Sequence, residues 1–399
     1  VEYTGQIRCW FYYLHVLSVA LFDKPAYKNC VVHGTILAKD GKKLSKSSKN
    51  YTDPMELMKT YGTDAFRLYL FRSNAIIMND LLFDEKGIKE QVQQVLLPLY
   101  NCASFFNSYA ILDKFEPDSV KLPSSDNELD KWILAKLYDT EKEVTNNMKN
   151  YQIDKYVEPI VELIDGFSSW YLRRSRRRFW ESEFTKDKQN AYETTYYVLV
   201  NICKLLAPVA PIISEYLYKN LTGEESVHLN ECCNISEEFK NSDILKETEV
   251  VQRVISLTRN LREKENIKIR QPLSRIEVAF TKDYSAIVNK FKETICEEVN
   301  IKDICILKEV EEIANVEYLP NFKTLGPKYG KDIKEIGNLI KNKSFEILDN
   351  GYKLANGDVV AALGVDMTGA TRRAAALSNV DFLKPSYGTV SRYGIISCA

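Results

Sequence analysis

The chain has 399 residues, of which 45% are hydrophobic and 27% are charged, and its formal net charge is −1. This length allows two or three domains with ample core, while the balanced charge leaves any nucleic-acid contact to local basic patches. No apolar run approaches the ~20 residues of a membrane span, and the first residues have neither the basic region nor the cleavage site of a signal peptide. We therefore expect a cytoplasmic protein that spans no membrane.

Nine cysteines are scattered along the chain, and none of them forms a C-x-x-C pair. This spacing favours free thiols in a reducing compartment over disulfides or a metal site, so we expect no structural zinc. The first residue is Val1 rather than methionine. We therefore interpret the chain as a fragment.

The first predicted elements are short. Residues 8–22 are expected to form a buried helix, and residues 27–39 a pair of short strands. Asp53 is a good N-cap and is followed by proline, which predicts a helix from there to about Gly62. A second helix is expected over residues 64–72. We therefore expect these strands and helices to hold the segment between them in a rigid position.

Apolar positions at helical spacing predict a bundle of about five helices in the middle of the chain. These helices are expected over residues 87–112, 127–150, 157–171, 186–206 and 211–221. A further helix at 247–265 is followed by strand, helix and strand at 275–281, 284–297 and 300–307. The sequence therefore predicts a mainly α protein with α/β parts that ends in a small α+β domain.

A lysine-rich loop lies between the predicted strands and the helix that begins at Asp53. It starts at the tight-turn signal Asp40-Gly41, and its centre reads Lys43-Leu44-Ser45-Lys46-Ser47. Lysine ammonium groups are mobile point charges, and serine hydroxyls and backbone N–H groups are neutral donors, so such a loop can clamp a polyphosphate. The alternative is a plain solvated loop.

The flanks of this loop favour the phosphate clamp. Val31-Val32-His33-Gly34 precedes it, and Asn50-Tyr51-Thr52-Asp53-Pro54 and then Tyr61-Gly62-Thr63-Asp64-Ala65-Phe66-Arg67 follow it. The whole run resembles the second nucleotide-binding motif of class I aminoacyl-tRNA synthetases, with leucine in place of the more usual methionine.

That resemblance implies ATP, accompanied by Mg²⁺, as the ligand of the loop, with no metal ligand in the chain itself. Lys43 and Lys46 would be catalytic and stabilise charge on the departing phosphates, while Ser45 and Ser47 would hold the loop or donate to the phosphates. His33 and Gly34 would lie near the nucleotide. A lone histidine at a strand end is also commonly structural.

The opening segment, Glu2-Tyr3-Thr4-Gly5-Gln6-Ile7-Arg8-Cys9-Trp10-Phe11-Tyr12, resembles a stretch of isoleucyl-tRNA synthetases that enters the active site. By resemblance Trp10 would wall the isoleucine pocket, with Gln6 nearby; alternatively, Trp10 is part of the core. The family usually has threonine and glycine where Ile7 and Cys9 stand, and glycine permits backbone conformations that cysteine does not.

An arginine block forms the second long match. Ser169-Trp170-Tyr171-Leu172 is followed by five arginines in six positions, which are Arg173, Arg174, Arg176, Arg177 and Arg178. Arginines flanked by aromatic residues on a helix suit an RNA backbone, although a solvated basic face is the default for a charge run. The block resembles the anticodon-binding bundle of isoleucyl-tRNA synthetases, so we expect these arginines to bind tRNA, with some of them tying the bundle to the catalytic domain.

A third match is Leu261-Arg262-Glu263-Lys264-Glu265-Asn266-Ile267, which resembles the junction that opens the C-terminal region of the same family. The resemblance then covers residues 1 to about 355. It implies the end of a Rossmann-type catalytic domain at 1–85, an anticodon-binding helical bundle at 86–235 and a partial α+β domain at 245–355.

The resemblance further implies a monomeric enzyme that activates isoleucine with ATP and transfers it to tRNA(Ile). The sequence contains no H-x-G-H-like motif and no inserted editing domain, so the isolated fragment is expected to be inactive. A non-enzymatic tRNA-binding module built on the same bundle is the competing hypothesis.

The tail at 356–399 has a different composition, rich in Gly, Ala and Ser with Lys384 as its one lysine. Its segments 363–375 and 384–394 resemble the amidase core of the A subunit of glutamyl-tRNA amidotransferase. Ala370 stands where that family has its nucleophilic serine, and a nucleophile also needs activating partners within reach. We interpret the tail as a foreign junction; a component of a tRNA-dependent amidotransferase is a third, weaker hypothesis.

Overall fold

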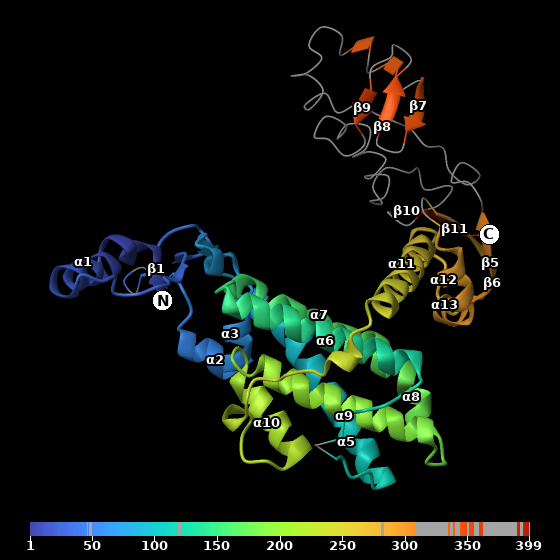
Figure 1. Ribbon diagram of the computed structural model, residues 1–399, viewed down its shortest axis with the longest axis horizontal. Helices are drawn as coiled ribbons and strands as arrows, with labels where there is room; N and C mark the ends of the chain where they lie inside the picture. Colours follow the sequence, from blue (N-terminus) through green and yellow to red (C-terminus); the bar gives the residue numbers. More distant parts are fainter. Residues whose placement is uncertain are drawn as a thin grey trace. The chain divides into compact units, whose positions relative to one another are not determined.

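The computed structural model describes residues 1–45, 47, 50–118, 121–280 and 283–307. After residue 333 it describes the short segments 334–335, 338–339, 344–348, 351–354, 359–361, 389–391 and 394–398. The chain divides into two compact units, Val1–Leu245 and Lys246–Ala399 (Figure 1). Each unit is described by itself.

The first unit opens with short parallel strands. β1 (Glu2–Tyr3) pairs in parallel with β2 (Val32–His33), and β3 (Ile36–Leu37) pairs in parallel with β4 (Leu81–Leu82). Parallel strands need a crossover connection, usually a helix, and helices do lie in the sequence between the partners of each pair. This pattern confirms the predicted α/β part of the fold.

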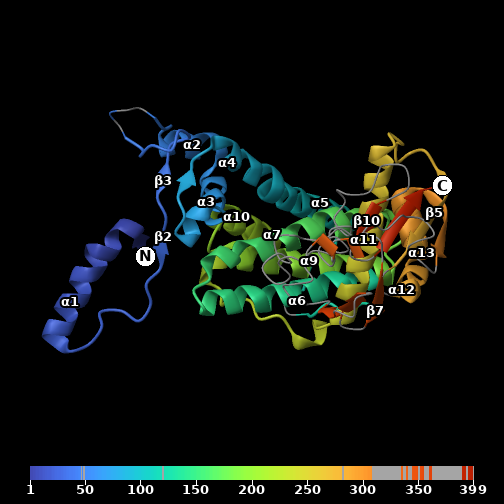
Figure 2. The ribbon, with the colours of Figure 1, turned by 90° about the horizontal axis from the view of Figure 1, so that it is seen from above.

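The first crossover helix, α1 (Trp10–Phe22), is mostly exposed. Phe11 is its one buried residue and packs edge-on against Tyr27, with ring centroids 5.8 Å apart. Leu17 and Phe22 are 59% and 69% exposed, and Figure 2 shows α1 standing apart from the bundle helices. The predicted helix is confirmed, but its predicted burial is wrong, because the described part of this unit supplies little besides Tyr27 to cover it.

The second crossover holds α2 (Pro54–Tyr61) and α3 (Thr63–Phe71), and α4 (Glu85–Gln91) follows β4. The Asp53 carboxylate caps α2, accepting from the Met55 amide at 2.7 Å. Buried Leu57, Ala65 and Ile88 join the three helices, with aromatic side chains packed around them. This small core fixes the helices that follow the lysine loop.

The helical bundle is built from the elements predicted by the apolar spacing. It contains α5 (Leu97–Asp113), α6 (Glu128–Lys149), α7 (Val157–Asp165), α8 (Arg173–Trp180), α9 (Lys186–Leu206) and α10 (Pro211–Thr222). A π-helical turn at Gly166–Leu172 joins α7 to α8. Helices α6, α7 and α9 lie side by side (Figure 1), and Ile133, Phe167 and Leu199 between them are 0% exposed.

The helical stretch Glu85–Asp113 is long and apolar enough to cross a membrane by length and composition alone. This stretch is not a continuous apolar run, because it contains Glu85, Lys86 and Lys89. A core helix of a soluble protein passes the same test, and Leu99 and Phe106 of this stretch are buried in the bundle. The stretch is therefore weak evidence for a membrane span.

The second unit contains a small sheet. Most of α11 (Ser242–Lys264) belongs to it, followed by β5 (Leu273–Ala279), α12 (Ser285–Lys290), α13 (Lys292–Val299) and β6 (Ile301–Leu307). β5 and β6 pair in parallel across the two helices. The sequence predicts this strand–helix–strand order, although the single helix expected over 284–297 is divided into two.

Further strands come from the last part of the chain. β7 (Phe345–Leu348), β8 (Gly351–Leu354) and β9 (Val359–Ala361) form an antiparallel sheet. β11 (Gly394–Cys398) pairs with β5 and with β10 (Thr389–Ser391). Ala370 and both amidase-like segments up to residue 388 lie outside the described residues, so the foreign origin of 356–399 stays a prediction.

Candidate functional site

The lysine loop begins in a tight turn after β3. The Ala38 amide donates to the Lys42 carbonyl at 2.8 Å, and Gly41 has a positive φ of 78°, which favours glycine. Asp40 accepts from the Lys42 amide at 3.1 Å, and this backbone hydrogen bond is the largest cause of its lowered pKa. The turn therefore fixes the direction in which the chain enters the loop at Lys43.

Asn50 closes the other side of the loop. Its side-chain oxygen accepts from the Ser45 amide and its nitrogen donates to the Lys43 carbonyl, both at 3.0 Å. The Ser45 and Ser47 hydroxyls meet at 2.7 Å, and Lys43 is exposed. Lys46 lies outside the described residues. The sequence prediction omitted Asn50, although an amide is the side chain that can accept and donate at once.

His33 at the end of β2 and Gly34 directly after it precede the loop. The His33 Nδ1 lies 2.9 Å from the Gly34 carbonyl oxygen, and the Gly34 amide donates to the Ala75 carbonyl at 2.7 Å. A Cβ at position 34 would lie 1.9 Å from the Asn79 carbonyl oxygen, so close backbone approach requires glycine there. His33 is half-buried, which leaves both the structural and the nucleotide role open.

The two candidates for the amino-acid pocket lie at the start of α1. The Gln6 side chain accepts from the Trp10 amide at 3.2 Å and so satisfies a donor of the first helical turn. Trp10 itself is 59% exposed. The alternative that Trp10 is a core residue of this chain is therefore wrong.

Arg178 is buried in the bundle. Its Nη1 and Nη2 donate to the two carboxylate oxygens of Asp130, each at 2.7 Å, and its Nε donates to Asp187 at 2.7 Å. Tyr171 donates to Asp130 at 2.8 Å. Burial by itself would lower the pKa of the Arg178 guanidinium, but hydrogen bonds and attraction from Asp130 outweigh it and raise the pKa. The expectation that Arg178 contacts tRNA is therefore corrected, because its hydrogen-bonding edge is occupied inside the protein.

The other arginines of α8 divide by exposure. Arg173, Arg176 and Arg177 are exposed, while Arg174 is half-buried with its guanidinium 4.8 Å from the Trp170 ring centroid. Positions three and four apart on a helix are neighbours on its surface. The spacing 173, 176 and 177 therefore places the three exposed guanidinium groups on one face. We call these three residues the arginine face.

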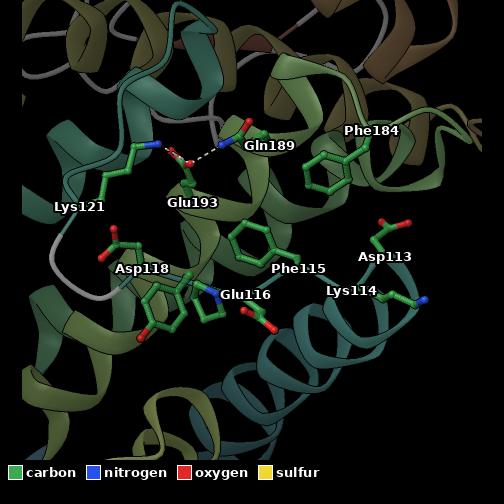
Figure 3. Close-up of a pocket in the computed structure, with 11 residues that line it drawn as sticks. Asp113, Lys114, Phe115, Glu116, Asp118, Lys121, Phe184, Gln189 and Glu193 are labelled. Atoms are coloured by element: carbon green, nitrogen blue, oxygen red, sulfur yellow. Dashed lines mark hydrogen bonds and ion pairs between the residues drawn. The ribbon is translucent and has the colours of Figure 1, made fainter.

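A shallow pocket of about 480 Å³ lies between the end of α5, the segment after it and α9 (Figure 3). Glu193 accepts from Lys121 at 2.7 Å and from Gln189 at 2.8 Å, and Phe115 stacks on Tyr192. Its charged lining residues are Asp113, Lys114, Glu116, Asp118, Lys121 and Glu193. Four carboxylates against two ammonium groups make it a poor site for phosphate.

Two family models match the regions just described. A model of tRNA synthetases class I (I, L, M and V) matches residues 1–83, which contain the lysine loop. A model of the anticodon-binding domain of tRNA ligase matches residues 130–278, which contain the arginine face. Residues 1–83 therefore belong to the class I tRNA synthetases, and residues 130–278 to their anticodon-binding domains. The chain carries catalytic-domain and anticodon-binding sequence in the order that this family implies.

Among the class I synthetases, the curated relatives that this chain is similar to are isoleucine–tRNA ligases. Isoleucine–tRNA ligase of Chlamydia pneumoniae is 41% identical over 338 residues, which are 84% of this chain and 32% of that protein. Isoleucine–tRNA ligase of Treponema denticola is 38% identical over 386 residues, with 92% of this chain and 34% of that protein covered. The chain therefore spans about a third of the length of the curated relatives that it matches.

A solved ternary complex of Agrobacterium radiobacter LeuRS with tRNA and LeuAMS aligns with a TM-score of 0.43 and 20% identity, covering 58% of this chain and 28% of that one. The curated relatives support the resemblance to isoleucyl-tRNA synthetases. None of these matches supports the amidotransferase hypothesis.

Proposed function

We propose that this chain is the part of an isoleucine–tRNA ligase that supplies the lysine loop of the ATP site and the anticodon-binding bundle. The observation that carries the proposal is its identity of about 40% to enzymes of that name over most of its length. The lysine loop and the arginine face add a chemical reason, since both present positive charge that suits phosphates.

The proposed reaction has two steps. An isoleucine carboxylate oxygen attacks the α-phosphorus of ATP, the bond to the β,γ-phosphates breaks, and isoleucyl-adenylate and pyrophosphate result. A hydroxyl at the tRNA 3′ end then attacks the isoleucyl carbonyl and AMP leaves. Catalysis of the first step is positioning together with charge stabilisation.

The loop residues have separate roles in this proposal. Lys43 and Lys46 stabilise negative charge on the departing pyrophosphate, and Ser45 and Ser47 donate hydrogen bonds. Asn50 holds the two sides of the loop at a fixed separation, which its paired hydrogen bonds support. Mg²⁺ would arrive with the ATP phosphates, which it commonly coordinates together with few protein ligands.

The amino acid and the tRNA use other parts of the chain. Gln6 and Trp10 would wall the isoleucine pocket together with residues from outside this chain. The arginine face would bind the tRNA(Ile) backbone, because exposed guanidinium groups pair with phosphate oxygens.

The test joins this chain behind the preceding part of the Chlamydia pneumoniae relative and measures isoleucine-dependent pyrophosphate exchange. In that chimera, Lys46→Ala should slow exchange by ~10²–10³, the scale for loss of one preorganised charge donor. Isoleucine affinity should change little. Lys59→Ala is the matched control, because Lys59 is exposed on α2 outside the loop.

Two different results would contradict two different parts of the proposal. Unchanged exchange in Lys46→Ala would remove Lys46 from catalysis. A folded chimera that exchanges pyrophosphate with another amino acid but not with isoleucine would contradict the substrate assignment.

A further inference from the structure

The helices that follow the lysine loop are attached to the bundle by one face of α3. Asp64 and Arg67 lie one helical turn apart on α3. Arg67 reaches the short connection between α9 and α10, and Asp64 reaches the first turn of α10, about 140 to 150 positions later in the sequence. Asp64 is 5% exposed. Neither residue belongs to the lysine loop or to the arginine face.

Asp64 caps the start of α10 from a distance. Its carboxylate oxygens accept from the Ile212 amide at 3.3 Å and from the Ile213 amide at 2.7 Å. Pro211 occupies the first position of α10 and has no N–H, and the residue before it, Ala210, provides no side-chain cap. The Asp64 carboxylate therefore replaces the missing local cap and places a negative charge at the positive end of the helix dipole.

Arg67 binds backbone carbonyl groups, whereas Asp64 binds backbone N–H groups. Its Nε donates to the Val209 carbonyl at 2.8 Å, and its Nη2 donates to the Pro208 carbonyl at 2.9 Å. The carboxylate and the guanidinium together satisfy two N–H groups and two C=O groups of one turn. This pairing is specific to the backbone and would be lost if α3 slid by one residue.

A third contact from α3 is weaker. Arg72 makes a two-point ion pair with Glu158 of α7 at 3.0 Å for each hydrogen bond. The Glu158 side chain is 53% exposed, so water and salt screen this pair. The hydrogen bonds between buried Asp64 and the first turn of α10 should therefore contribute most to the attachment of α3 to the bundle.

The attachment continues to the lysine loop through a short rigid path. Ala65, next to Asp64, packs against Leu57 of α2, and α2 begins at its cap, Asp53. Thr52 of the connecting segment hydrogen-bonds to Glu85 at the start of α4. The end of the lysine loop is therefore attached to the three-helix core of α2, α3 and α4. Asp64 and Arg67 join this core to the bundle.

We infer that Asp64 and Arg67 are positioning residues that couple tRNA binding on the bundle to the helices carrying the lysine loop. The inference rests on the proposed tRNA-binding role of the bundle. Their hydrogen bonds form a contiguous network between the two regions, and a coupling claim of this kind requires a direct measurement.

The measurement is hydrogen exchange of the α2 amides in the full chain, with and without a tRNA(Ile) transcript. The unmodified chain should show slower α2 exchange with tRNA by about fivefold or more, the lower end of usual coupling factors. The double variant Asp64→Ala, Arg67→Ala should lose this protection while it still binds the transcript. Arg67→Lys, which keeps a charged donor, should restore part of the protection relative to Arg67→Ala.

Glu158→Ala is the matched control, because it removes the exposed partner of Arg72 on α7, leaves the bonds of Asp64 and Arg67 in place and should keep most of the protection. Bound tRNA without α2 protection in the unmodified chain would overturn this inference alone. Persistent protection in the double variant would also overturn it. Failure of the unmodified chain to bind the transcript would instead overturn the proposed function and this inference with it.

Discussion

Helix α1 is more apolar than the bundle helices, and yet its side chains are covered far less. Trp10 and Phe22 of α1 are 59% and 69% exposed, whereas Phe167 and Tyr171 in the bundle are 0% exposed. A helix that is hydrophobic all round is normally buried. The bundle carries its own core, whereas the described residues leave most of α1 uncovered.

The same difference appears among charged residues. Arg178 is enclosed by Asp130 and Asp187 inside the bundle, whereas Arg173 on the preceding turn is exposed. Arg178 therefore stabilises the fold from inside the bundle, whereas the residues of the arginine face lie at the surface. Residues of the same type therefore differ in burial, which hydrophobicity or charge alone does not decide.

The largest expected effect comes from breaking the buried ion pair. Arg178→Ala should lower the free energy of unfolding by ~3–5 kcal/mol, because Asp130 would be left charged and buried without its partner. Urea denaturation followed by circular dichroism measures this loss. Arg176→Ala is the matched control and should change stability by less than ~0.5 kcal/mol, as exposed substitutions usually do. A small loss in Arg178→Ala would contradict a structural role for this arginine.

The smallest expected effect comes from α1. Leu17→Ser with Phe22→Ser should change the free energy of unfolding of the chain by no more than ~0.5 kcal/mol, because both side chains are already exposed. The same variant should remain monomeric at higher concentration, since exposed apolar patches promote association. Denaturation and light scattering check the two parts. A loss of several kcal/mol would show that α1 packs inside the chain.

Local signals in the sequence were enough for much of this architecture. The helical spacing predicted the bundle, and Asp53 followed by proline predicted the start of α2 at Pro54. The lysine loop was recognisable because its residues are adjacent in the chain. These features depend on neighbours within one or two helical turns.

Other features depended on contacts between distant residues. Arg178 pairs with Asp130, 48 positions away, and Asp64 caps α10 across 149 positions. No spacing rule in a single sequence reports such pairs, so the sequence did not show which arginine of the block is held inside the bundle. The burial of α1 was also mispredicted, because its apolar composition does not say whether the covering surface lies in this chain.

The central claim is that the bundle binds the tRNA backbone through the arginine face, and the salt dependence of tRNA(Ile) binding tests it most directly. Replacing Arg173, Arg176 and Arg177 with glutamine should weaken binding and reduce the slope of log K against log salt by about 0.9 for each lost duplex phosphate contact. Replacing exposed Lys59, Lys86 and Lys89 with glutamine removes the same charge from α2 and α4 and should leave the slope nearly unchanged. Circular dichroism must show that both variants are folded. An unchanged slope in the arginine variant, or an equal fall in the lysine control, would contradict the account.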